Sequence, residues 1–155
     1  MAESALAGKT ALTNERLNVK ASFTQQGRSP LKEALARPTG HVALRIEGIE
    51  FEKAPEDYYE VYLNPPPGRL DYKNPHYVGN LSFFGLVGHP DQPPPKFVVL
   101  DLTRTLKALQ KAGQLDMQTM TFRFVRRGTI PPASKREEPK PGVRATFTRI
   151  AVVSY

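Results

Sequence analysis

Three proline clusters divide the chain into short segments and so limit what it can fold into. They are NPPPG at residues 64–68, PDQPPP at 90–95 and PPASKREEPKP at 131–141. Proline fixes φ and lacks the backbone N–H that a helix interior or a central strand must donate. Segment 64–77 is therefore predicted to be a long exposed loop, and the elements between the clusters must be short.

Alternation of apolar and polar side chains marks the first strands. A period of two residues places one face of a strand on a core. Residues 17–23 show this pattern, and so do residues 42–46. After Gly48 the phase shifts, so that Ile49 and Phe51 continue the alternation. We interpret this shift as a β-bulge at Gly48.

Further strands are predicted along the rest of the chain. In residues 58–63, Tyr59, Val61 and Leu63 share one face, while Tyr58, Glu60 and Tyr62 share the other. Residues 77–87 are extended, residues 96–102 form a short buried strand, and Met120, Phe122 and Phe124 lie on one strand face. Residues 143–155 form one long final strand. Short strands separated by Pro/Gly-rich turns indicate an antiparallel β-sandwich or small barrel of about seven strands.

One short helix is expected after the strand at residues 96–102. Leu102, Leu106 and Leu109 recur at helical spacing, and Gly113 is placed to end the helix as a C-terminal cap. Residues 30–37 could form a further helical turn. The predicted organisation is an N-terminal segment 1–40, with one strand and a linker, followed by a β-sandwich domain at 41–155.

Composition narrows the possible functions. The net charge is +7, but residues 41–125 are nearly neutral, and the surplus lies in residues 1–40 and in the proline-rich stretch after residue 126. This distribution disfavours a continuous phosphate-binding groove. The chain has no cysteine, no apolar run long enough for a membrane helix and no evident signal peptide. We expect a soluble protein of undetermined compartment.

Catalytic motifs are not evident. His41, His76 and His89 are far apart in the sequence and form no H-x-x-x-H pair for a metal, although the fold could still assemble a composite site. The carboxylates between Glu47 and Glu60 have no histidine companion, and no G-x-S-x-G or phosphate-binding loop is present. An autonomous enzyme is therefore not expected.

Several motifs together resemble one known family. IEGIEF at 46–51 followed by YYEVYLN at 58–64 resembles the paired signature of the C-terminal domain of polyphenol oxidases and bacterial tyrosinases. YVGNLSFFGLVGH, LDLTRTLKAL, FRFVRRG and FTRIAVV are similar to later segments of that domain. The similarity covers about residues 41–155. Tyr59 and Glu60 stand where the family usually has Phe and Asp, which preserves the alternation.

The resemblance implies that the chain corresponds to the C-terminal domain that covers the enzyme's active site, without the catalytic domain itself. In that family the C-terminal domain is a β-sandwich that packs over the dicopper site of the catalytic domain, where an apolar or aromatic side chain can occupy the substrate's place. By this reading the chain binds no cofactor itself. Its partner is a copper-containing polyphenol oxidase catalytic domain or subunit, which the chain covers and holds latent. Leu70 and Tyr72, with Leu86 in a competing loop, are the candidate plug or interface residues.

Alternative functions remain open. A copper-delivering helper of a tyrosinase could use His76, His89, Met117 or Met120 as ligands. An unrelated β-sandwich module could bind nucleic acid, through its basic ends and exposed tyrosines, or a glycan.

Overall fold

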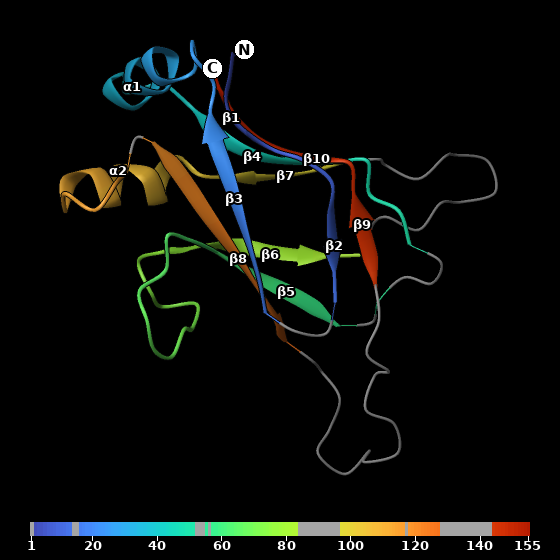
Figure 1. Ribbon diagram of the computed structural model, residues 1–155. Coiled ribbons are helices and arrows are strands. Elements are labelled where there is room, and N and C mark those ends of the chain that lie inside the picture. Colours follow the sequence, from blue (N-terminus) through green and yellow to red (C-terminus); the bar gives the residue numbers. More distant parts are fainter. Residues whose placement is uncertain are drawn as a thin grey trace, which may run out of the picture.

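A computed structural model describes residues 2–13, 16–51, 55, 57–83, 97–116, 118–127 and 144–155. Within them lies an antiparallel eight-stranded sheet with the order β6-β5-β8-β3-β1-β10-β4-β7. Its end strands β6 and β7 approach each other, so the sheet is nearly closed into a barrel (Figure 1). The strands are β1 (Ala2–Ala7), β3 (Leu17–Phe23), β4 (Val42–Glu47), β5 (Tyr58–Leu63), β6 (Tyr77–Ser82), β7 (Phe97–Asp101), β8 (Thr119–Arg127) and β10 (Arg149–Ser154). The mostly β, barrel-like fold predicted from the sequence is confirmed.

A small second sheet pairs β2 (Thr10–Leu12) with β9 (Ala145–Phe147). β2 follows β1 in the chain and β9 precedes β10, so this pair continues the ladder between β1 and β10 after a bend. The segment 1–40 thus contributes β1, β2 and β3 to the two sheets, and the strand predicted over 17–23 is confirmed.

Two helices flank the barrel. The predicted helix is α2 (Thr103–Lys111). The N–H of Gln114 donates to the Leu109 carbonyl and that of Gly113 to the Gln110 carbonyl. Gly113 has a φ of 70°, so these bonds form the glycine-ended cap that the sequence indicates. The other helix, α1 (Arg28–Ala36), is longer than the single turn expected and lies at one end of the barrel, beside both chain termini (Figure 1).

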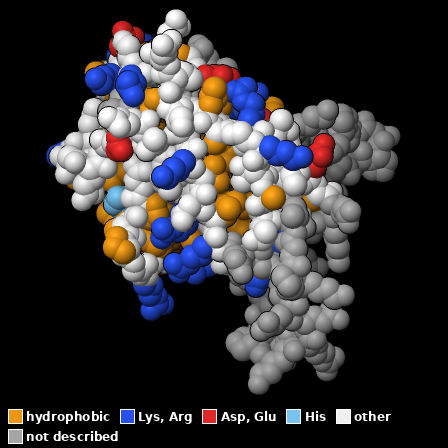
Figure 2. Space-filling view, in the orientation of Figure 1, with side chains coloured by type: hydrophobic (Ala, Val, Ile, Leu, Met, Phe, Trp, Pro, Cys, Tyr) orange, Lys and Arg blue, Asp and Glu red, His pale blue; other side chains and the backbone are white. Residues whose placement is uncertain are grey.

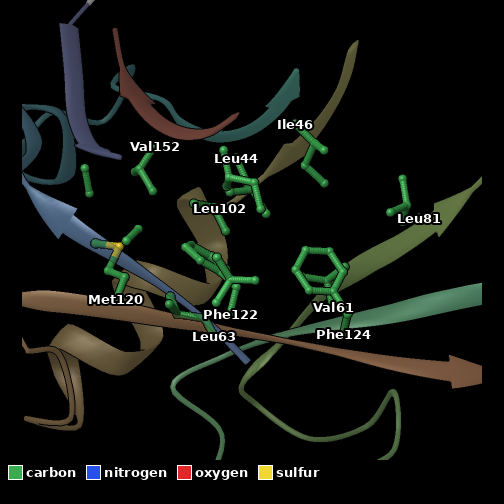
Figure 3. Packing of buried hydrophobic residues seen from close by; sticks show 14 of the residues in the cluster. Leu44, Ile46, Val61, Leu63, Leu81, Leu102, Met120, Phe122, Phe124 and Val152 are labelled. Carbon is green, nitrogen blue, oxygen red and sulfur yellow. The ribbon is translucent and has the colours of Figure 1, made fainter. Parts of the chain in front are cut away.

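The core fills the barrel with apolar side chains from the inner faces of the strands. Figure 3 shows Leu44, Ile46, Val61, Leu63, Phe122 and Phe124 pointing toward one another. Leu31 of α1 and Leu106 of α2 belong to the same buried cluster. The inward faces predicted for β5 and β8 are confirmed, since Tyr59, Val61, Leu63, Met120, Phe122 and Phe124 are all fully buried.

The predicted bulge at Gly48 and the single long final strand are both wrong. Glu47 pairs with Arg149 and Glu50 with Thr146, so the register is the same on both sides of Gly48. Both strands bend there instead: Gly48 has a φ of 66°, and a Cβ on it would lie 1.9 Å from the Thr148 hydroxyl. The bend separates β9 from β10 at Thr148 and produces the change of phase.

Two further expectations are corrected. β7 is not a buried strand, because it is an end strand of the sheet and leaves Phe97 47% and Val99 49% exposed. The segment 64–77 is not uniformly exposed either, since Leu70 and His76 are buried in it. No helix in the described part of the chain is long and apolar enough to cross a membrane.

Candidate interaction surface

The loop at residues 64–76, called here the 64–76 loop, connects β5 to β6 and is fixed by hydrogen bonds at its base. Asn64 donates its N–H to the Thr121 carbonyl at 2.7 Å and accepts the Thr121 N–H at 2.8 Å. The Leu63 N–H donates to the His76 carbonyl at 2.9 Å, and the His76 ring nitrogen Nδ1 lies 2.9 Å from the Leu63 carbonyl. Both ends of the loop are therefore attached to the barrel.

The tip of the loop is also ordered by local bonds. The Lys73 N–H donates to the Asp71 carboxylate at 2.8 Å, and the His76 N–H donates to the Asn74 side chain at 2.9 Å. Such side-chain turns, together with the three prolines at 65–67, restrict the backbone. The loop can therefore present a side chain at low entropic cost.

Leu70 is buried on the outside of the barrel. Only 2% of its surface is exposed, and it packs in a small apolar cluster with Tyr62, Tyr77 and Val125. Arg127 donates from Nη2 to the Leu70 carbonyl at 2.7 Å, which fixes the loop backbone above β8. In this conformation the Leu70 side chain is not accessible to a partner.

Tyr72, two residues further on, is 65% exposed. Its ring has the Lys73 ammonium 5.9 Å from its centroid, an exposed cation–π contact of about 0.5–1 kcal/mol. Leu86, the competing candidate, lies outside the described residues. Of the three predicted plug residues, Tyr72 is thus the one that the structure places on the surface, and its role as a plug stays a prediction.

A buried polar group lies beside the loop on the outer face of β5. Glu60 is 6% exposed and forms an ion pair with Arg127, and the Tyr62 hydroxyl donates to Glu60 at 3.4 Å. Burial, and secondarily the negative charge of Glu60, raise the pKa of Tyr62 to about 12. Burial also raises the pKa of Tyr77.

We expect the free energy of unfolding to fall as the pH rises from about 10 to about 12. In that range the folded chain keeps the Tyr62 proton that the unfolded chain loses, so ionisation favours unfolding. Urea unfolding at a series of pH values would show the loss, and Tyr62→Phe should reduce it. An identical pH dependence for the variant would contradict the assignment to Tyr62.

The residues predicted as copper ligands of a helper protein are not brought together where the structure describes them. Met120 points into the core, whereas His76 lies at the base of the 64–76 loop. His89 and Met117 lie outside the described residues. Among the described residues there is no group of three or more His, Asp or Glu side chains that could hold a metal ion.

Sequence reasoning missed a group of ion pairs at the start of β5, at the opposite end of that strand from the 64–76 loop. Asp57, which is 4% exposed, contacts Arg144 at 2.6 Å and Arg126 at 3.4 Å. In the sequence these three residues are ordinary charged positions far from one another, and no local pattern connects them.

One family model matches most of this chain. The family described as a domain of unknown function, DUF7868, matches residues 2–137. A search of curated proteins gave no match.

Solved structures show the same fold in latent enzymes. Latent aurone synthase, a polyphenol oxidase, is 15% identical with a TM-score of 0.55, over 94% of this chain and 25% of that one. Latent apple tyrosinase is 16% identical with a TM-score of 0.53, and the match covers 94% of this chain and 27% of that one. The chain spans about a quarter of the length of these enzymes. The resemblance to a domain of polyphenol oxidases is confirmed at the level of the fold.

Proposed function

The chain belongs to the DUF7868 family, and we propose that it is a non-catalytic shielding domain or subunit that packs over the dicopper site of a polyphenol oxidase catalytic domain. The observation that carries the proposal is the extent of the structural match. Nearly the whole chain superposes on only a quarter of an enzyme whose structure is that of a latent form. The part that is shared is thus one domain of a larger protein.

The 64–76 loop supplies a side chain suited to this role. Tyr72 is exposed, aromatic and held on a loop whose ends and tip are hydrogen-bonded. A phenol ring resembles the aromatic substrates that a polyphenol oxidase accepts, so it can fill such a site while burying apolar surface. We propose that Tyr72 enters the partner's substrate site and that the surrounding loop excludes substrate.

The proposal predicts inhibition in trans. Adding the purified chain to the copper-loaded polyphenol oxidase catalytic domain of the same organism should lower diphenol oxidation, and Tyr72→Gly should weaken that inhibition by about tenfold. Tyr155→Gly removes another tyrosine, which is 51% exposed and directly follows β10, and serves as the matched control. The chain alone, with added copper, should oxidise no phenol.

Three results would contradict parts of this proposal. Diphenol oxidation by the chain alone, abolished by a chelator, would contradict a non-catalytic role. Undiminished oxidation by the catalytic domain in the presence of excess chain would contradict shielding. Unchanged inhibition by Tyr72→Gly, together with lost inhibition by Leu86→Gly, would assign the plug to the competing loop.

A further inference from the structure

The outer face of β3 and β8 continues directly into the 64–76 loop. Arg123 of β8 lies opposite both Asn18 of β3 and Tyr62 of β5, and it donates from Nε to the Asn18 side chain at 2.8 Å. One row away, Lys20 lies opposite Thr121. Thr121 is bonded to Asn64, where the loop begins, so the strand face and the loop form one continuous surface.

This surface carries basic side chains that the described part of the chain does not neutralise. Lys20, Arg69 and Lys73 are exposed and form no ion pair with any described residue. Arg123 is bonded to a neutral amide. In Figure 2, Lys and Arg side chains gather over β8 and beside the loop, while the Asp and Glu side chains visible in that view lie elsewhere. We call Lys20, Arg69, Lys73 and Arg123 the basic face.

The acidic residues near the basic face do not neutralise it. Glu60 is buried and paired with Arg127. Asp71 is exposed and accepts the backbone N–H of Lys73. It is one negative charge beside the four positive charges of the basic face. The basic face therefore keeps a net positive charge.

On the half of the sheet formed by β1, β10 and β4, the cations are paired with anions. There Arg45 pairs with Glu47 at 2.9 Å, and Arg149 pairs with Glu3 at 2.7 Å and with Glu47 at 3.3 Å. Cations on the outside of β4 and β10 are thus matched by anions of the same sheet. The four cations of the basic face have no such match among the described residues, and two of them, Arg69 and Lys73, lie on the same loop as the exposed Tyr72.

We propose that the basic face docks onto an acidic surface surrounding the substrate opening of the catalytic domain. This inference rests on the proposed function and adds the charge of the partner's surface to it. Complementary charge at the rim of an interface mainly accelerates association and fixes orientation. The four cations thereby guide Tyr72 toward the opening, while the ring itself provides the buried contact.

The test is the salt dependence of inhibition, measured with the whole chain and the copper-loaded catalytic domain. Inhibition by the wild-type chain should weaken as sodium chloride is raised. At low salt the double variant Arg69→Glu/Lys73→Glu should inhibit about tenfold more weakly, with a smaller dependence on salt. Lys32→Glu/Arg104→Glu makes the same change of charge at exposed positions on the two helices and should behave as wild type.

The outcomes separate the two proposals. Inhibition that is independent of salt and equal for both double variants overturns the basic face but leaves the shielding function intact. No inhibition or binding by the wild-type chain overturns both. Salt-sensitive binding of DNA or RNA, lost in Arg69→Glu/Lys73→Glu, without binding of the catalytic domain, would make the basic face a nucleic-acid surface and overturn the inference. Circular dichroism establishes that each variant is folded. The single variant Lys73→Glu repeats the test with half the change of charge.

Discussion

Val61→Asp is expected to leave the chain unfolded. Val61 is fully buried at the middle of β5, opposite Gly79 of β6 and Phe124 of β8, and points into the core (Figure 3). An aspartate there would have to be ionised without a partner, or protonated with its polar atoms unpaired. Either state costs several kcal/mol, which is comparable to the whole stability of a small domain.

Circular dichroism and thermal unfolding measure this effect. Val99→Asp is the matched control, because Val99 also lies within a strand, β7, but is about half exposed. The control should keep a cooperative unfolding transition close to that of the wild-type chain. A similar transition for Val61→Asp would show that position 61 does not face the core.

Period-two alternation predicted much of the fold because it reports which face of a strand is buried. Burial alternates in this way along β3 and over residues 119–124 of β8. In β5 the predicted inner face is buried, but Glu60 and Tyr62 on the other face are buried as well. The helix α2 could be predicted from the sequence for a similar reason. Its leucines face the core, and Gly113 adopts the positive φ that ends the helix.

What the sequence could not show was the partner of each strand. The change of phase at Gly48 has the same appearance whether one residue is inserted or two paired strands bend together. Only the pairing of Glu50 with Thr146 distinguishes the bend from a bulge. Likewise, the apolar composition of β7 is typical of a buried strand, but its position at the end of the sheet leaves Phe97 and Val99 exposed.

The sequence also could not distinguish the buried from the exposed residues of the candidate interaction surface. Leu70 and Tyr72 are equivalent in the sequence, as two large side chains in a proline-rich loop. The structure separates them because Arg127 holds the backbone of Leu70 against β8, where Tyr62 and Val125 cover its side chain. That contact joins residues 57 positions apart in the chain, and no local pattern encodes it.

Asp57 forms another long-range contact that the sequence concealed, and replacing it should have the second-largest effect on stability. Its carboxylate accepts from Arg144 Nη1 at 2.7 Å and lies 3.4 Å from Arg126 Nε. Arg126 belongs to β8, whereas Arg144 precedes β9 and donates its backbone N–H to the Leu12 carbonyl of β2. Asp57 thus links the large sheet to the small one.

Asp57→Ala should lower the free energy of unfolding by about 3 kcal/mol, because it leaves two partly buried guanidinium groups without their anion. Arg126 and Arg144 keep 23% and 17% of their side chains exposed, so water offsets part of the loss and the chain should remain folded at room temperature. The denaturant midpoint should therefore fall while the slope of the transition stays the same. Glu33→Ala, at an exposed position of α1, is the control and should change stability by less than about 0.5 kcal/mol. Equal midpoints for the two variants would mean that the attraction within the cluster only balances the cost of burying its charges, so that Asp57 positions the small sheet without stabilising it.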